Sequence, residues 1–319
     1  MKAPSPPRSG LEFTADWDGV RLDVFLAQKM PRRSRGALQE MIRAGQVEVD
    51  GAAAKPDRRL RSGERVSVSF PKRSWLQEFD FESRVIFEDK HLLIFDKPAA
   101  LLMHPARPGW LEDPRAAQDE ASPNFAGLMA ARRPEVLSSG VKRCGVVHRL
   151  DAETSGIFVA AKTEAAWRRL TEAFEERSIE KAYRAVVRGQ VSEQLSEIDA
   201  PVGRLTGSRR IKTTPFGRPA RTALRLLETF PAASYVEAKP LTGRTHQIRA
   251  HLSFVGHPVA GDIDFDRGAA ASPRPPRLML HAYALRFAHP ISGKALSFRR
   301  NPPGDFSRFL KICREGRPR

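Results

Sequence analysis

The chain has 319 residues, which is enough for one large domain or two smaller ones. Hydrophobic residues make up 41% of it, so the sequence can bury a sizeable core and wholesale disorder is excluded. Its 54 Lys and Arg residues outnumber 37 Asp and Glu residues, which gives a net charge of +17 and a pI near 10.6. Such a surplus attracts polyanions, so nucleic acid is the favoured partner. An anionic membrane surface is the alternative, but no apolar run approaches the ~18–20 residues that span a bilayer.

The cysteines and the N-terminal residues bear on the compartment. Cys144 and Cys313 are the two cysteines, and their spacing supports neither a disulfide framework nor a cysteine zinc site. The first ten residues, MKAPSPPRSG, lack the apolar centre of a secretory signal. We therefore expect a reducing compartment, namely the cytoplasm, or an organelle if the source is eukaryotic.

Shifts in composition divide the chain into five parts. Residues 1–18, rich in Pro, Ser and charge, are expected to form a flexible segment. A compact module follows at 19–71, and 72–83 mixes proline, charge and single aromatics as a linker does. The pattern then changes to that of a larger domain at 84–310, followed by a basic tail at 311–319.

The module begins with two helical patterns. Apolar residues at helical spacing between residues 22 and 30 predict a first helix, which Pro31 ends. Ser34 is a candidate N-cap for a second helix, and Gly45 is a natural residue to close it. The alternating segments QVEVDG and VSVSF then predict two strands. Two short helices followed by two strands make a small α/β module.

The larger domain mixes short strands and helices. VIFEDKHLLIFDKP, GIFVAAKT, KAYRAVVRG and RTALRLLETF are predicted strands, and 163–177 and 245–255 are helical. Regular β-α-β alternation is absent, so we expect an α+β fold with a mixed, largely antiparallel sheet, flanking helices and a central cleft. The stretch 106–140 has weak periodicity and is expected to be a long excursion from this core.

Basic residues gather in three places. Residues 1–73 hold 15 Lys and Arg against 9 Asp and Glu, and 204–225 holds seven basic residues and no acidic one. From Arg299 to the end there are seven basic residues against two acidic ones. Any single cluster is explained by a solvated surface, but three of one sign favour contact with phosphates.

GVVHRLDAETSGIFVAAKT at 145–163 is the first segment that points to chemistry. Val146 and Val147 lead in as a strand, the chain breaks at Ser155-Gly156, and a strand resumes. Asp151 is thus placed in a connecting loop, where side chains are free to face a cleft. The residues alone leave three interpretations open: Asp151 is a nucleophile, a general base or a turn-stabilising aspartate.

GRTHQIRAHLSFVGHPVAGD at 243–262 is the second. Thr245 is expected to cap a helix that runs to about Val255, which puts Arg249 near the helix start. There it is able to pair with a carboxylate and keep it ionised, although a solvent-facing arginine is the simpler alternative. The neighbouring histidines lack HExxH spacing, so we expect no metal.

KAYRAVVRG at 181–189 is the third segment that points to chemistry. Strand alternation puts Lys181, Tyr183 and Ala185 on one face. The tyrosine either fills a core or, in a nucleic-acid enzyme, stacks on a base taken out of its helix.

Together these segments resemble the RluA-type pseudouridine synthases. The resemblance is carried by HRLD at 148–151, TSG at 154–156, KAYRAVVRG at 181–189, TGRTHQIRAHL at 242–252 and the lead-in DKPAALLMHP at 96–105. The module at 19–71 is similar to an S4 RNA-binding domain. Three features depart from the family pattern. The family has a proline near the position of Cys144, and this chain lacks it. GDIDFDRG at 261–268 replaces a shorter glycine–tyrosine turn, and the stretch 106–140 is unusual. The departures leave substrate choice open.

The resemblance implies isomerisation of uridine to pseudouridine in RNA without a cofactor or a metal. Asp151 matches the family's catalytic aspartate, which attacks the sugar C1′ or removes the C2′ proton. Tyr183 matches the tyrosine that stacks on the uracil, and Arg249 matches the basic partner of the aspartate. Arg149 matches a residue that inserts into RNA as the target nucleotide flips out.

Further RNA contacts are expected from His148 and Arg244 beside these motifs, and from Arg35 and Arg43 in the S4-like module. The favoured partner is ribosomal RNA, with tRNA as the alternative, and we expect a monomer. Two other functions remain as hypotheses: a non-catalytic RNA-binding or ribosome-assembly factor, which the module and the charge alone motivate, and a metal-dependent hydrolase, which rests on scattered His and Asp residues.

Overall fold

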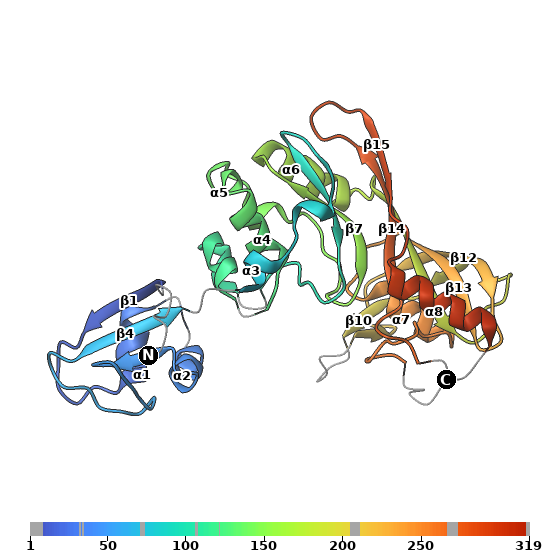
Figure 1. The fold of residues 1–319 in the computed structure, drawn as a ribbon. Coiled ribbons are helices and arrows are strands. Elements are labelled where there is room, and N and C mark those ends of the chain that lie inside the picture. The colour runs from blue at the N-terminus through green and yellow to red at the C-terminus, as the bar shows by residue number, and fades with distance from the viewer. Residues whose placement is uncertain are drawn as a thin grey trace. The chain divides into compact units, whose positions relative to one another are not determined.

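The computed structural model describes residues 9–31, 33, 35–70, 74–105, 108–120, 122–204, 211–266 and 274–316. The chain divides into two compact units, Met1–Glu78 with Arg107–Glu112, and Phe79–Ala106 with Asp113–Arg319 (Figure 1). No helix in the described part of the chain is long and apolar enough to cross a membrane.

The N-terminal unit packs two helices against a small antiparallel sheet (Figure 1). The helices are α1 (Leu22–Lys29) and α2 (Arg35–Arg43). The sheet has the order β1-β4-β2-β3, with β1 (Ser9–Thr14), β4 (Arg65–Phe70), β2 (Val47–Val49) and β3 (Ala52–Ala53). Phe25 and Leu38 from the helices meet Val66 of the sheet in a core that excludes water. Ser34, the candidate N-cap, lies outside the described residues.

Strand β1 corrects the expectation of a flexible segment over 1–18. Phe13 pairs with Val66 and Leu11 with Val68, and the Phe13 ring meets Phe25 edge-on with 6.4 Å between centroids. These apolar contacts and the β1–β4 hydrogen bonds order the segment, although its composition is that of a linker. Residues 1–8 of the expected segment lie outside the described residues. Downstream, α3 (Ser74–Glu78) and η1 (Glu82–Arg84) occupy part of the span expected as a linker.

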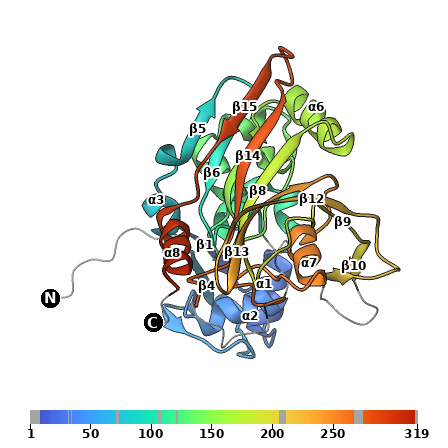
Figure 2. The same cartoon turned by 90° about the vertical axis from the view of Figure 1, so that its right-hand side faces the viewer.

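The second unit is built on one large sheet (Figures 1 and 2). Within the described residues nine strands form it in the order β5-β6-β7-β14-β8-β13-β12-β9, with β15 paired to β14. They are β5 (Val85–Glu88), β6 (Leu92–Lys97), β7 (Ser155–Ala161), β8 (Glu180–Arg188), β9 (Glu197–Asp199), β12 (Arg221–Thr229), β13 (Ala233–Pro240), β14 (Leu280–Ala288) and β15 (Ala295–Arg299). The β7–β14 pair is parallel and the other pairs are antiparallel, which confirms the α+β class with a mixed, largely antiparallel sheet.

Helices pack on this sheet at both of its ends. The helices of this unit are α4 (Phe125–Arg132), α5 (Glu135–Ser138), α6 (Glu164–Glu175), α7 (Gln247–Phe254) and α8 (Gly304–Glu315), with the 3₁₀ turns η3 (Pro114–Asp119) and η4 (Lys142–Gly145). A further 3₁₀ turn, η2 (Pro108–Leu111), belongs to the N-terminal unit. β10 (Val202–Arg204) and β11 (Ile211–Thr213) form a separate hairpin. α6 buries Ala166 and Leu170 against Leu285 of β14, while α7 and α8 join the core on β8 and β13. Figure 2 shows α7 and α8 at the end of the sheet away from α6.

The expectation that 106–140 is an excursion from the core is wrong for the second half of that stretch. α4 is almost wholly buried, and Phe125 meets Phe158 of β7 edge-on with 4.5 Å between centroids. Its Ala and Gly residues weaken the apolar periodicity because the helix lies close to its neighbours: a Cβ at Gly127 would lie 2.5 Å from the Ala117 carbonyl oxygen. Small residues here reflect close packing.

The expected tail at 311–319 and the strand at Val146 are also corrected. α8 continues to Glu315 and buries Phe309, Leu310 and Cys313, so the basic residues lie on the outer side of a packed helix. Residues 317–319 lie outside the described residues. Before Asp151 the chain forms η4, and Val146 makes a single antiparallel bridge to Ala160 where a strand was expected.

Candidate active site

Residues from all three motifs line one cavity of about 300 Å³ in the second unit. Asp151 comes from the loop between η4 and β7, Tyr183 from β8 and Arg249 from α7. His148, Arg149 and Arg244 line the same cavity. Residues nearly 100 positions apart are therefore neighbours, as the resemblance led us to expect.

The loop that carries Asp151 is fastened at both ends. Gly156 has φ +116° and lies so close to β14 that a Cβ would collide with the backbone of Ala282. Ser155 Oγ and His281 Nδ1 are 2.9 Å apart at the same parallel junction. This is why the TSG motif ends in glycine: only glycine fits this backbone conformation and this close approach.

Lys97 secures the other side of the loop. Its buried amine donates hydrogen bonds to the carbonyl oxygens of Ala152 at 2.8 Å, Leu101 at 2.7 Å and Pro98 at 3.1 Å. Burial lowers the pKa of Lys97 to about 7. One side chain thus ties the residue after Asp151 to the end of β6.

The Asp151 carboxylate meets two polar groups from the α7 region. Its Oδ2 lies 2.9 Å from His246 Nδ1 and accepts a hydrogen bond from Arg249 Nη1 at 3.3 Å. Burial raises the pKa of Asp151, but the hydrogen bond and charge of His246 and the charge of Arg249 outweigh it, so the net pKa lies below its ordinary value. The carboxylate is therefore ionised at neutral pH although it is largely shielded from water.

Arg249 is itself held by two further aspartates. Its Nε and Nη2 donate to both oxygens of buried Asp262 at 2.6 and 2.7 Å, and Nη2 also donates to Asp264 at 2.8 Å. The guanidinium lies over the ring of Phe265, 5.4 Å from its centroid. Asp262 in turn accepts the backbone N–H groups of Asp264 and Phe265. These residues belong to GDIDFDRG, the segment that departs from the family pattern, and the sequence reasoning did not assign them to the site.

His246 begins α7 in place of the expected Thr245 cap. It has φ +52°, a left-handed conformation uncommon for a side-chain-bearing residue, and makes no side-chain cap. Its Nδ1 lies 2.6 Å from Arg249 Nη1 as well as 2.9 Å from Asp151. One ring nitrogen cannot donate to Asp151 and accept from Arg249 at once, so His246, Arg249 and Asp151 form a coupled set. The strained backbone puts the imidazole into this set.

The TGR turn before His246 is fixed by Gln247. Its Oε1 accepts from Thr242 Oγ1 at 2.6 Å and from the Arg244 N–H at 3.0 Å. Its Nε2 donates to the Arg221 carbonyl at 2.9 Å and to Thr222 Oγ1 at 3.0 Å. A buried amide with this many partners fixes the turn that places Arg244 at the cavity.

Tyr183 faces Asp151 across the cavity from the sheet. Burial, followed by the negative charge of Asp151, raises the pKa of Tyr183 above its ordinary value. The phenol is therefore neutral. Tyr183 and Asp151 line the same cavity.

His148 and Arg149 differ sharply although they are neighbours. The His148 ring stacks on Phe174 with 4.3 Å between centroids, and its Nε2 accepts the Val159 N–H at 3.1 Å. Burial lowers the pKa of His148 to about 3, so the ring is neutral. Arg149 is exposed at the mouth of the cavity. Only Arg149 of this pair has its charge free to reach an anionic substrate.

Arg35 and Arg43 lie in the N-terminal unit. Arg35 opens α2 and pairs at 3.1 Å with Asp23, a buried carboxylate that also accepts from Arg21 and Gln39. Arg43 is exposed in the last turn of the same helix. Arg35 thus has a structural partner that the sequence did not reveal.

The three histidines considered for a metal are separated by their partners. His246 contacts Asp151, His251 Nε2 lies 2.8 Å from the Ala200 carbonyl, and His257 Nδ1 lies 2.9 Å from the Arg188 carbonyl. Within the described residues, no group of three or more His, Cys, Asp or Glu side chains is arranged to hold a metal ion.

A loop carboxylate paired with an arginine and faced by a tyrosine, on a mixed sheet, is the arrangement expected of a pseudouridine synthase, and comparisons with known proteins agree. The family model described as RNA pseudouridylate synthase matches residues 91–254, and the S4 domain model matches residues 20–66. The chain therefore belongs to the RNA pseudouridylate synthase family and carries an N-terminal S4 domain, through which it binds RNA.

Relatives match along almost the whole chain. "Ribosomal large subunit pseudouridine synthase D" of Nitrosomonas europaea is 37% identical over 93% of this chain and 85% of its own length. The protein of the same name in Pseudomonas aeruginosa is 34% identical, over 96% of both chains. "Ribosomal large subunit pseudouridine synthase C" of Escherichia coli O157:H7 is 31% identical over 99% of this chain and 100% of its own.

Solved structures agree with the fold. Human RNA Pseudouridylate Synthase Domain Containing 1 matches with a TM-score of 0.54 at 28% identity, covering 69% of this chain and 83% of that chain. Human RNA Pseudouridylate Synthase Domain Containing 4 gives a TM-score of 0.57 at 20% identity, which supports the fold alone. The protein is an RNA pseudouridine synthase, an isomerase, as the motifs led us to expect. The binding-only and hydrolase hypotheses are set aside.

Proposed function

We propose that the enzyme converts uridine to pseudouridine in large-subunit ribosomal RNA, with Asp151 as its catalytic residue. One observation carries the assignment to Asp151: its carboxylate is held ionised by His246 and Arg249 in a cavity that Tyr183 also lines. The names of the relatives from Nitrosomonas europaea and Escherichia coli O157:H7 support ribosomal RNA. Transfer RNA is the alternative substrate.

The reaction rearranges bonds within one nucleotide. The N1–C1′ bond breaks, the freed uracil turns, and a C5–C1′ bond forms. C5 then loses its proton and N1 gains one, so nothing is added or removed overall. Asp151 starts the process either by attacking C1′ or by taking the C2′ proton, and both routes need the ionised carboxylate that the site provides.

The other cavity residues have supporting parts in this proposal. Tyr183 stacks on the uracil and holds it near C5, and its neutral phenol avoids repulsion from Asp151. Arg249 is a positioning residue that keeps Asp151 ionised and aimed. Arg149, exposed at the mouth, fills the gap left by the flipped nucleotide and offsets part of the unstacking cost of a few kcal/mol.

RNA outside the cavity is held by other cations. Arg43 on α2 is exposed, and among the described residues the Arg244 side chain at the cavity donates only its Nε, to the Pro219 carbonyl at 3.3 Å, which leaves its terminal nitrogens for phosphates. Arg35, by contrast, is shared with Asp23, and His148 is packed on Phe174. We keep the prediction that the enzyme acts as a monomer in the cytoplasm. Size-exclusion chromatography with light scattering and cell fractionation check these two points.

The test of the catalytic assignment is Asp151→Asn. It should abolish pseudouridine formation and leave RNA affinity nearly unchanged, because Asp151 is one group in an extended contact surface. Asp199→Asn, at an exposed carboxylate outside the cavity, is the matched control and should keep full activity. Pseudouridine retained in the Asp151 variant would refute the assignment. Maps of pseudouridine in ribosomal and transfer RNA, from cells with and without the protein, decide the substrate.

A further inference from the structure

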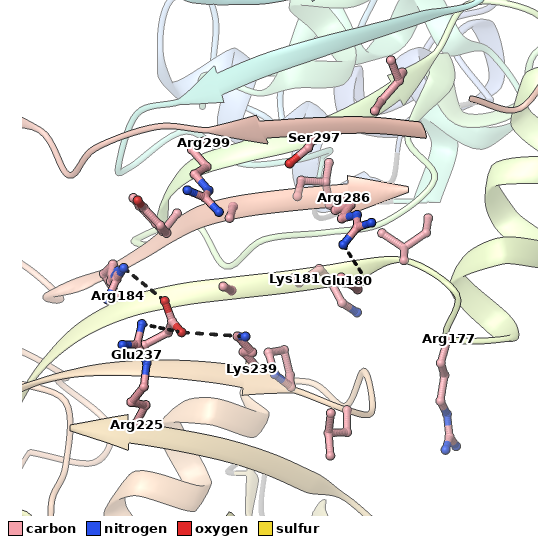
Figure 3. Close-up of a pocket in the computed structure, with 18 of the residues that line it drawn as sticks. Arg177, Glu180, Lys181, Arg184, Arg225, Glu237, Lys239, Arg286, Ser297 and Arg299 are labelled. Atoms are coloured by element: carbon pink, nitrogen blue, oxygen red, sulfur yellow. Dashed lines mark hydrogen bonds and ion pairs between the residues drawn. The ribbon is translucent and has the colours of Figure 1, made fainter. Parts of the chain in front are cut away.

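A second hollow, of about 720 Å³, lies on the sheet of the synthase unit (Figure 3). Strands β12, β13, β8, β14 and β15 and the loops beside them line it. Side chains alternate along a strand, so Arg184 of β8 points to the face opposite that of its neighbour Tyr183. Arg184 is thus on the other face of β8 from Tyr183, although the hollow, which we name the sheet groove, shares Lys181 and Pro240 with the active-site cavity.

The sheet groove is strongly cationic. Besides Lys181, which also lines the active-site cavity, six basic residues line it against two acidic ones: Arg177, Arg184, Arg225, Lys239, Arg286 and Arg299 against Glu180 and Glu237. Figure 3 shows that a single carboxylate, Glu237, is shared by three of the cations. Arg184, Arg225 and Lys239 approach it at 3.1, 3.2 and 3.9 Å. The positive charge is therefore far from neutralised within the groove.

The remaining cations have even less compensation. Arg286 is 3.8 Å from Glu180 in a pair exposed to solvent on both sides. In the described part of the chain neither Arg177 nor Arg299 forms an ion pair. Exposed pairs of this kind contribute ~0–1 kcal/mol, so these side chains exchange partners at little cost.

The groove also has the depth and breadth for an extended ligand. Its floor holds Ala182 and Ala284, which lie opposite one another in the β8–β14 register, while long cationic side chains rise around them. Five adjacent strands cover roughly 19 Å, taking ~4.8 Å for each interstrand step. Cations spread over that width suit a chain of phosphates better than one small anion, which binds where donors converge on a point.

We propose that the sheet groove binds the phosphate backbone of the RNA substrate at a place away from the target uridine. The proposal rests on the proposed function, because the RNA that binds the groove is the same RNA whose uridine the enzyme modifies. It assigns Arg225, Lys239, Arg286 and Arg299 to grip on a distant part of a large folded RNA. A short RNA that carries only the target loop should not reach these four residues, none of which lines the active-site cavity.

The test replaces these four residues by Gln in the full-length enzyme. Its control replaces four exposed cations outside the groove, Arg168, Lys294, Arg308 and Lys311, and so makes the same change in net charge. Affinity is measured over a range of salt concentrations for a large-subunit ribosomal RNA transcript. The other substrate is a short hairpin cut around the uridine that the pseudouridine maps identify.

Four lost phosphate contacts should lower the slope of log affinity against log salt by roughly three, at ~0.7–0.9 for each contact. We expect the groove variant to bind the transcript at least about tenfold more weakly than the control variant. Turnover of the short hairpin should be equal in both. Equal binding of the transcript by the groove and control variants would overturn the proposal.

A single substitution gives an independent test. Ser297 of β15 lies opposite Arg286 and lines the groove, so Ser297→Glu puts a carboxylate among the cations and removes none. It should weaken binding of the transcript, whereas Ser297→Gln should not, and equal affinities would count against the groove. If the wild-type enzyme modifies no ribosomal uridine, the proposed function fails, and a groove-dependent RNA affinity would still stand.

Discussion

The substitution Asp262→Asn separates the support of the active site from its chemistry. Asp262 is 1% exposed and accepts two hydrogen bonds from Arg249, while Arg249 donates to Asp151. Asn keeps the size of the side chain but removes the charge and turns one acceptor into a donor facing the guanidinium. Asp262 does not line the cavity, so substrate contacts stay unchanged.

The expected magnitudes follow from burial. Removing one partner of a buried ion pair costs ~3–5 kcal/mol, and we expect about 3 kcal/mol because Asn keeps the backbone N–H bonds of the loop. In a domain of this size that is a fall in Tm of roughly 6–12 °C. A displacement of Arg249 by about 1 Å would lower kcat about a hundredfold, with little change in KM for RNA.

Asp264→Asn is the matched control because it alters a second carboxylate on the same Arg249 nitrogen. Asp264 is half exposed, so its bond is worth at most ~1 kcal/mol. The assay is single-turnover pseudouridine formation at saturating enzyme, below the Tm of every variant, with thermal unfolding measured in parallel. Full kcat in Asp262→Asn, or equal losses in the two variants, would refute the view that buried Asp262 aims Arg249.

Three further predictions concern other parts of the synthase unit. Gly156→Ala should lower the free energy of unfolding by more than ~3 kcal/mol, because φ is +116° and the new Cβ meets the Ala282 backbone. The control is Gly36→Ala in α2, where nothing lies within 4 Å of the new Cβ, and it should not destabilise the protein. Urea titrations compare the two variants. Burial lowers the pKa of His281 to about 4, so between pH 6.5 and 4 the unfolded chain binds a proton that the folded chain does not, and the free energy of unfolding falls as the pH drops through that window. Over the same range the free energy of unfolding of His281→Gln should fall by up to about 3 kcal/mol less than that of the wild type. An equal fall in both proteins would contradict the prediction. Arg149→Ala should leave Tm unchanged and slow modification more for a paired uridine than for an unpaired one, which quantitative pseudouridine mapping on two matched RNAs checks.

The meeting of Asp151, Tyr183 and Arg249 could be predicted because each lies in a segment with its own pattern. HRLD and the TSG turn, a strand with alternating residues and the start of a helix each place one side chain. Their order along the chain then resembles one family. The proposed chemistry depends on these few residues, and local structure determines where each of them lies.

The support of Arg249 could not be predicted in the same way. Asp262 and Asp264 reach it because the chain turns back after α7 through Gly261, which has φ +81° and lies against the Arg277 carbonyl. The sequence pattern of GDIDFDRG does not predict that the chain turns back toward Arg249. The available signal was the pair of aspartates two residues apart behind a glycine, in a segment that departs from the family pattern.

Packing explains the errors in the fold. β1 was missed because Pro-rich neighbours outweigh two alternating apolar residues, Leu11 and Phe13, whose value comes from pairing with β4. α4 was missed because Ala and Gly blur its apolar face, although Phe125 is fully buried. In both places the decisive contacts are with distant segments, and a local pattern carries little of that information.

The carboxylates around Arg249 distinguish the cations that pair within the protein from those that remain to attract RNA. Asp151, Asp262 and Asp264 surround this one guanidinium, and its Nε and both terminal nitrogens donate to them. Four of the five N–H groups of Arg249 are used in this way, which leaves little for a phosphate, and three carboxylates around one cavity repel a polyanion. Attraction of RNA must therefore come from cations outside this set, such as Arg149 and Arg244 at the cavity. A net charge of +17 fits an enzyme in which the proposed catalytic carboxylate, Asp151, must work against the charge of an RNA substrate.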